Sequence, residues 1–140
     1  MTRSASAEWR GGLKDGKGSV SSASGVLKDN QYSFGTRFEQ GVGTNPEELI
    51  AAAHASCFAM ALSAQLGEAN LTAESIQAKA TVTLEKLQDG WAVTKSHLDV
   101  RARIPGAQRE AFEKAANNAK AGCPISKLLK AEITMNATLE

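Results

Sequence analysis

The 140-residue sequence predicts an α+β fold in which antiparallel sheet packs around one central helix. Residues 45–66 are an almost wholly apolar run with a capped start, and a helix that is apolar on every side must be enclosed by protein. Short alternating segments precede this run, and an alternating hairpin follows it. The length and the absence of a linker predict a single domain over residues 1–140.

The first part of the chain predicts a meander of short strands. Six glycines interrupt residues 5–38 and leave short alternating pieces between them. The central helix should then begin at residue 46. Asn45 is a suitable N-cap, Pro46 suits the first helical position, and Glu48 stands where a capping box has its acid.

Beyond the central helix, residues 76–85 alternate between apolar and polar side chains, which predicts a half-buried strand. Asp89 and Gly90 form a strong hairpin signal. The partner strand should cover residues 91–104. Its apolar phase shifts along the strand, which predicts a one-residue bulge near Lys95 and Ser96.

The C-terminal third predicts two helices and a strand. Pro105 and Gly106 precede an amphipathic helix that ends at Gly122, and a short helix over 124–130 follows it. The apolar stripe of the first helix is Phe112, Ala115, Ala116 and Ala119. Residues 133–139 alternate again and predict the last strand.

Composition excludes several classes of function. The chain is 42% hydrophobic and 22% charged with a net charge of +1, so it offers no electrostatic footprint for nucleic acid or an anionic membrane. The first residues lack the apolar core of a signal peptide. The apolar run is rich in alanine and carries polar residues such as His54 and Gln65, which favours a buried helix over a membrane span. We therefore expect a cytoplasmic protein without a membrane partner.

The apolar helix also predicts an oligomer. The sheet of one small domain covers one face of a helix, so the other face needs a second layer. A second copy of the same chain would supply that layer fully. We expect an intimate homodimer.

The chain has two cysteines, Cys57 in the central helix and Cys123 in the segment AGCPIS. In the cytoplasm such a pair is more typical of redox or metal chemistry than of a stabilising disulfide. The two cysteines and two well-separated histidines make a poor zinc set, because structural zinc sites need four ligands. We therefore expect no metal.

The two thiols differ in their electrostatic surroundings. Cys123 precedes a proline that opens a helix, so its sulfur should face the free N–H groups of the first turn, which favour a thiolate. Cys57 stands twelve residues past Asn45, beyond the reach of the helix dipole. The apolar surroundings alone would raise the pKa of the Cys57 thiol. To react, Cys57 needs a cation from elsewhere in the fold.

Two residues are candidates for that role. Arg37 lies upstream of the helix, and the alternative is that it is an ordinary exposed arginine on a strand. His54 precedes Cys57 by three residues and shares its side of the helix, so it is placed to accept the thiol proton. We favour the alternative for His54, in which it only packs and bonds its neighbours.

Glu47 and Glu48 include at least one acid that suits a helix start. At about 1.5 Å per residue, Glu47 and Cys57 lie about 15 Å apart along one helix. They cannot serve one site from the same continuous helix. Two such helices that cross in a dimer would bring Glu47 of one chain towards Cys57 of the other.

The segments TNPEELIAAAHASCFAMAL and KAGCPISKLLKAEI resemble the osmotically inducible protein C family, which is related to the organic hydroperoxide resistance proteins. The likeness extends over essentially the whole chain, including GSVSSASGVL and TRFE. GLKDGKG lacks the arginine that the hydroperoxide resistance branch carries in its N-terminal loop, and TRFE supplies one instead.

This resemblance implies a thiol peroxidase that is an intertwined homodimer, with sheets wrapped around central helices and sites at the interface. It implies that Cys57 is the peroxidatic nucleophile and Cys123 the resolving thiol. Arg37 would hold the thiolate and the peroxide, and Glu47 would orient Arg37. The substrate would be a small organic hydroperoxide, with an external dithiol as reductant and no cofactor.

Two other classes of function stay open. A non-catalytic stress-response protein or redox sensor would use the Cys57–Cys123 disulfide to switch partner binding. A cysteine hydrolase with Cys57 and His54 is a more distant alternative, since no partner for the histidine and no oxyanion motif is visible.

Overall fold

The computed structural model describes residues 1–140 and confirms the α+β class. The chain forms two compact units, Met1–Leu49 and Ile50–Glu140. Each sheet lies within one of these units. The single domain over residues 1–140 stays a prediction.

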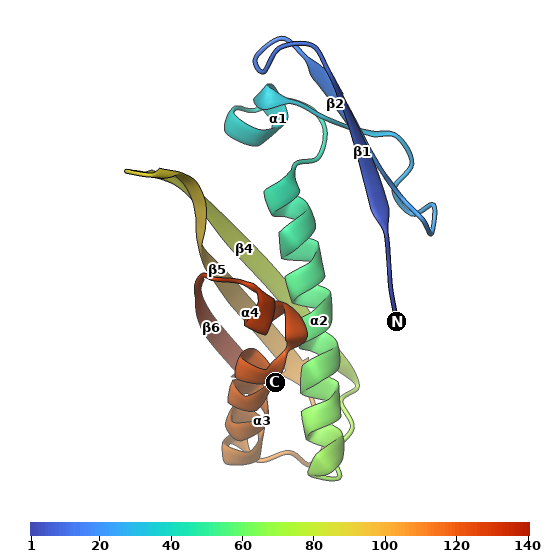
Figure 1. Ribbon diagram of the computed structural model, residues 1–140. Helices are drawn as coiled ribbons and strands as arrows, with labels where there is room; N and C mark the ends of the chain where they lie inside the picture. Colours follow the sequence, from blue (N-terminus) through green and yellow to red (C-terminus); the bar gives the residue numbers. More distant parts are fainter. The chain divides into compact units, whose positions relative to one another are not determined.

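The first unit contains the predicted meander. Strands β1 (Ala5–Arg10), β2 (Lys17–Ser22) and β3 (Asn30–Tyr32) form an antiparallel sheet in that order (Figure 1). Gly18 lies so close to the rings of Trp9 and Tyr32 that a Cβ on it would come within 2.7 Å of both. The glycine therefore lets these two aromatic rings approach each other, with centroids 5.6 Å apart.

The meander ends earlier than predicted, because Phe34–Phe38 is a short helix, α1. Ser33 and Thr36 cap this helix reciprocally, each side chain bonding the backbone N–H of the other. The alternative that Arg37 is an exposed strand arginine is therefore wrong about the strand, since Arg37 lies in the last turn of α1, and right about the exposure. A five-residue helix is too short to show the periodicity that identifies a helix in a sequence.

Helix α2 (Pro46–Glu68) is the long apolar helix. Its start is confirmed, because the side-chain oxygen of Asn45 accepts a hydrogen bond of 2.8 Å from the N–H of Glu48. The Glu48 carboxylate accepts a hydrogen bond from the Thr44 hydroxyl. By length and hydropathy α2 is the one helix able to cross a membrane, a test that the core helix of a globular fold also passes.

One face of α2 is buried, and the opposite face is not. The buried side chains recur every four residues: His54, Phe58, Leu62 and Leu66. Met60, between them, is 76% exposed. The expectation that protein surrounds α2 on all sides is therefore not met within one chain.

The second unit holds the larger sheet, β4 (Ser75–Leu87), β5 (Gly90–Arg103) and β6 (Glu132–Leu139). The β4–β5 hairpin is confirmed, and Gly90 adopts the positive φ of 124° at its turn. The pairing shifts where Thr83 faces Lys95 and Leu84 faces Val93. Thr94 is therefore the extra residue, next to the predicted bulge.

One detail of the predicted sheet is wrong, because β6 pairs parallel to β5 and the sheet is mixed. Helices α3 (Arg109–Gly122) and α4 (Pro124–Leu128) connect these two strands. A crossover of a dozen or more residues is the connection that parallel neighbours need. Helix α4 also ends at Leu128, before the predicted residue 130.

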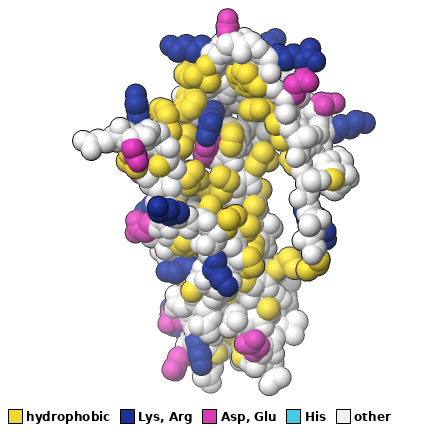
Figure 2. Space-filling view, viewed as in Figure 1, with side chains coloured by type: hydrophobic (Ala, Val, Ile, Leu, Met, Phe, Trp, Pro, Cys, Tyr) yellow, Lys and Arg dark blue, Asp and Glu magenta, His cyan; other side chains and the backbone are white.

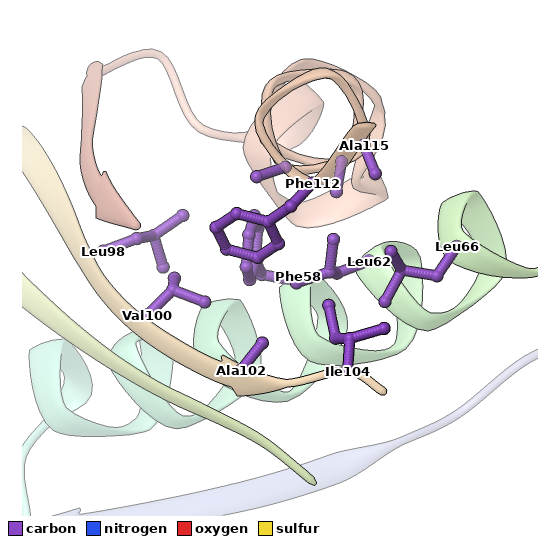
Figure 3. Packing of buried hydrophobic residues seen from close by; sticks show 11 residues of the cluster. Phe58, Leu62, Leu66, Leu98, Val100, Ala102, Ile104, Phe112 and Ala115 are labelled. Atoms are coloured by element: carbon purple, nitrogen blue, oxygen red, sulfur yellow. The ribbon is translucent and has the colours of Figure 1, made fainter. Parts of the chain in front are cut away.

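The core of the second unit forms where α2, β5 and α3 meet. Figure 3 shows Phe112 pointing from α3 towards Leu98 of β5 and Phe58 of α2. The predicted stripe of α3 is confirmed, since all four of its members are buried. These contacts fix the middle of α2 against the segment in which α3 ends and α4 begins.

Candidate active site

The two cysteines meet inside the second unit. The sulfur of Cys57, on α2, lies 2.8 Å from the sulfur of Cys123, and both residues are free thiols. This separation exceeds the about 2.05 Å of a disulfide bond. Cys123 is fully buried, whereas Cys57 is partly exposed. Residues 66 positions apart in the chain thus form one dithiol pair.

Cys123 owes its position to a corner between two helices. It is the C-cap of α3 and the N-cap of α4 at once, and Pro124 opens α4. Its own N–H bonds the carbonyl of Ala119 at 2.9 Å. The predicted N-cap position of Cys123 is therefore confirmed.

The surroundings make Cys123 the more acidic thiol. Burial alone would raise the pKa of Cys123, but hydrogen bonds from Cys57, Ser126 and Ile125 together hold it below its usual value. For Cys57, burial raises the pKa, and the hydrogen bond with Cys123 raises it further. The N–H of Ile125 opposes this increase. The start of α4 therefore acts on both sulfurs, although the sequence predicts an effect on Cys123 only.

His54 lies one helical turn before Cys57 but bonds two serines. Its Nδ1 lies 2.7 Å from the hydroxyl of Ser96, and its Nε2 lies 2.8 Å from the hydroxyl of Ser126. The ring is fully buried, and burial lowers the pKa of His54. The interpretation in which His54 packs and bonds its neighbours is confirmed.

The sequence did not single out Ser96 or Ser126. Ser126 had a usable signal, because it is the third residue of α4 and an N-cap side chain faces the N–H groups of that turn. Ser96 had none, since its contact with His54 joins residues 42 positions apart.

The other two predicted site residues meet in the first unit. Arg37 forms a salt bridge with the carboxylate of Glu47 through two guanidinium nitrogens, which we call the Arg37–Glu47 fork. Nε lies 3.2 Å from both oxygens, and Nη2 lies 2.8 Å from Oε1. The Glu47 side chain is 11% exposed and that of Arg37 is 38% exposed. A partly buried carboxylate thus fixes a guanidinium that solvent still reaches.

An apolar cavity lies beside this pair, within the first unit. Its volume is about 220 Å³, and Arg37 is the one charged residue in its lining. The lining residues are Trp9, Leu13, Tyr32, Ser33, Phe34, Arg37, Phe38 and Pro46. The guanidinium carbon of Arg37 stands 5.5 Å from the centre of the Phe38 ring. The cavity therefore offers one fixed cation and an aromatic wall.

The sequence profile of the OsmC-like protein family matches residues 39–138. The chain belongs to the OsmC-like protein family. It is 52% identical over 134 residues to peroxiredoxin OsmC of Escherichia coli, covering 96% of this chain and 94% of that protein. It is 28% identical over 124 residues to organic hydroperoxide resistance protein OhrB of Bacillus subtilis, covering 88% and 89%.

Solved structures of OsmC-like proteins share the fold. The crystal structure of OhrB of Bacillus subtilis superposes with a TM-score of 0.72 at 26% identity, over 96% of this chain and 98% of that one. An OsmC-like protein from Vibrio cholerae gives a TM-score of 0.77 at 18% identity, over 99% of both chains, which shows the fold alone.

These matches confirm the family that the motifs indicated. The names peroxiredoxin and organic hydroperoxide resistance protein support a peroxidase enzyme with an antioxidant role in peroxide defence. The roles of the individual residues stay predictions.

Proposed function

We propose that this OsmC-like protein is a thiol-dependent peroxidase that reduces organic hydroperoxides to alcohols through a Cys57 sulfenic acid and a Cys57–Cys123 disulfide. The observation that carries the proposal is the dithiol pair at the start of α4, with its sulfurs 2.8 Å apart. A sulfenic acid formed on either sulfur would have the other thiol in contact.

The reaction has three steps. The Cys57 thiolate attacks the terminal oxygen of the hydroperoxide, the O–O bond breaks, and the alkoxide leaves as the alcohol after it takes a proton. Cys57 is then a sulfenic acid. Cys123 attacks its sulfur, which forms the disulfide and releases water. An external dithiol reduces the disulfide by exchange and restores both thiols.

Access supports Cys57 as the first thiol, although Cys123 is the more acidic one. A hydroperoxide must touch the sulfur that it oxidises, and Cys57 is partly exposed whereas Cys123 is fully buried. Each sulfur contacts the other, so the pair can share one proton. A cation beside Cys57 would place the negative charge on Cys57 and the proton on Cys123.

We propose Arg37 as that cation. The fork to Glu47 uses Nε and Nη2, so the hydrogens of Nη1 lie outside it. The apolar cavity beside Arg37 suits the organic part of a hydroperoxide, and hydrogen peroxide would leave it empty. An organic substrate should therefore react faster than hydrogen peroxide.

A homodimer would account for the exposed apolar face of α2 and for the small number of buried residues in the first unit. The face of α2 opposite the core carries Met60 among small residues, and Figure 2 shows hydrophobic side chains along α2 on the face turned to the viewer. The first unit buries only Gly18 and Thr36. A second copy that covers these surfaces would bring Arg37 and Glu47 of one chain to Cys57 of the other.

The decisive experiment measures peroxide consumption by the wild type, Cys57→Ser and Cys123→Ser. An organic and an inorganic peroxide should be compared, each with a dithiol and a monothiol reductant. We expect sustained turnover of the organic peroxide with the dithiol, and no turnover for Cys57→Ser. A single stoichiometric oxidation without turnover would favour the redox sensor. Localisation in the cytoplasm, where dithiol reductants are available, is part of the proposal.

A further inference from the structure

Two contacts of equal spacing join α2 to the first turn of α4. Cys57 of α2 meets Cys123, and three residues earlier on α2, His54 meets Ser126, three residues after Cys123. Beyond His54, Ser96 of β5 bonds the second ring nitrogen. Ser96, His54, Ser126 and Cys123 therefore form one buried or half-buried chain of polar groups.

The number of protons on the His54 ring and on the Ser126 hydroxyl determines which groups donate in this series of hydrogen bonds. Burial lowers the pKa of His54, so the ring is neutral, with one nitrogen as donor and the other as acceptor. The Ser126 hydroxyl has one proton and lies within reach of both His54 and the Cys123 sulfur. It can donate to the sulfur only if His54 Nε2–H donates to the Ser126 oxygen. Nδ1 then accepts from the Ser96 hydroxyl.

We propose that His54 and Ser126 are positioning residues for Cys123: the chain Ser96–His54–Ser126 fixes the Ser126 hydroxyl so that it donates to the Cys123 sulfur. All donors then point the same way and end at that sulfur, an arrangement in which each bond strengthens the next. His54 acts only through Ser126 and does not touch the reacting atoms.

The proposal deepens the resolving step and rests on the proposed function for that role. The Cys123 thiolate attacks the Cys57 sulfenic acid, the new S–S bond forms, and the departing hydroxide takes up the proton that Cys123 released, giving water. Ser126 would hold the thiolate before attack. In the return reaction it would stabilise Cys123 as a leaving group when a dithiol attacks Cys57.

Other groups also act on the Cys123 sulfur, but only one of them is a side chain. Cys57 from α2 and the N–H groups of Ile125 and Ser126 from α4 face the sulfur, and Ala119 of α3 receives only the backbone N–H. Lys127, the cation of α4, is exposed, as is Lys130 after it. The Ser126 hydroxyl is thus the one side chain besides Cys57 that bonds Cys123.

The test uses Cys57→Ser, in which Cys123 is the single thiol. Thiolate absorbance in the ultraviolet, recorded against pH, gives the Cys123 midpoint without any peroxide. Adding Ser126→Ala should raise this midpoint by about one pH unit, because a hydrogen bond to a charged group is lost. Ser126→Thr should restore it. Ser56→Ala is the matched control, since Ser56 on α2 bonds only backbone carbonyls, and its midpoint should not move.

An unchanged midpoint in Ser126→Ala, or an equal shift in Ser56→Ala, would overturn the proposal. If Ser126→Ala does not fold, Ser96→Ala replaces it. We then expect a smaller rise of the Cys123 midpoint, and an unchanged midpoint would contradict the proposed series of hydrogen bonds from Ser96 through His54 to Ser126. Because the measurement needs no turnover, failure of the peroxidase proposal would be seen separately in peroxide consumption. In the two-cysteine protein, Ser126→Ala should slow disulfide formation.

Discussion

The two compact units of the chain differ in what holds them together. The second unit has a core in which α2, β5 and α3 interlock around Phe58, Leu98 and Phe112. The first unit buries no apolar side chain, and its two buried residues are Gly18 and Thr36. The second unit is therefore held together by a packed apolar core, and the first unit has no comparable core of its own.

The chemistry divides in the same way. The second unit holds the two thiols, fixed by a helix corner and a packed core. The first unit holds the Arg37–Glu47 fork and an apolar cavity beside it. We propose that the cation of the first unit and the thiols of the second unit form one site when two chains assemble, and the following experiments test this proposal.

The largest expected effect is recovery of activity from two inactive proteins. Cys57→Ser and Glu47→Ala subunits should each be inactive, and refolding an equal mixture should restore about a quarter of wild-type activity. Half of the dimers would be mixed, and each mixed dimer would keep one site with both wild-type residues. Peroxide consumption measures the recovery, and mass spectrometry confirms the mixed dimers. Mixed dimers without activity would place each site within one chain.

Removing the central ring of the second unit should cost the most stability. Phe112→Ala deletes a fully buried side chain, so the free energy of unfolding should fall by about 3–5 kcal/mol. Phe112→Leu keeps more of the volume and should cost less. Denaturant unfolding measures both. A Phe112→Ala protein as stable as the wild type would show that the core of the second unit lies elsewhere.

Removing the cation of the first unit should slow the chemistry and spare the fold. Arg37→Ala should reduce the rate with an organic hydroperoxide by about 100-fold, the usual effect of losing one donor that stabilises developing charge. Arg10→Ala is the matched control, because Arg10 pairs with Glu8 in the same unit and is exposed. Stopped-flow oxidation gives both rates. Equal rates for Arg37→Ala and the control would make Arg37 a surface residue.

The smallest expected effect is a dependence of stability on pH that belongs to the second unit. Burial lowers the pKa of His54, whereas the unfolded chain titrates it near the ordinary value of about 6.5. The unfolded state then binds more protons below that pH. The contribution of His54 to the free energy of unfolding should be fully present above about pH 6.5 and should be lost as the pH falls below that value.

The two histidines separate this effect from others. His54→Gln should flatten the loss of stability below about pH 6.5, and His97→Gln, which changes a histidine bonded at the sheet surface to Thr134 and Asp99, should keep it. Denaturation midpoints at several pH values give the comparison. An identical slope in His54→Gln and the wild type would assign the effect to other groups.

Long periodic elements and helix caps are predictable from the sequence, whereas very short helices and the direction of a strand are not. The period of α3 and the alternation of β4 are local, so both were visible, as were the caps at Asn45 and Cys123. Helix α1 was missed because five residues capped by Ser33 and Thr36 show no period. The direction of β6 was missed because parallel pairing follows from the crossover through α3 and α4.

In the candidate site, too, motif residues are predictable from the sequence and long-range contacts are not. Both thiols and the Arg37–Glu47 pair were identified by residue, through motif and family resemblance. The serines that hold His54 were not, since their contacts span 42 and 72 positions and no local pattern encodes them. The hydrogen bond from Ile125 to both sulfurs also depends on α2 reaching the start of α4, which is a tertiary contact.

The proposed roles of Cys57 and Cys123 are tested most directly by finding which thiol a hydroperoxide oxidises first. Cys57→Ser and Cys123→Ser should each receive a stoichiometric amount of an organic hydroperoxide together with a diketone that traps sulfenic acids, and peptide mass spectrometry should locate the adduct. Acidity favours Cys123 as the first thiol to be oxidised, because its pKa is lowered. Access favours Cys57, because Cys123 is fully buried. We expect an adduct on Cys57 in Cys123→Ser and none in Cys57→Ser. An adduct on Cys123 alone would reverse the two roles and contradict the proposal.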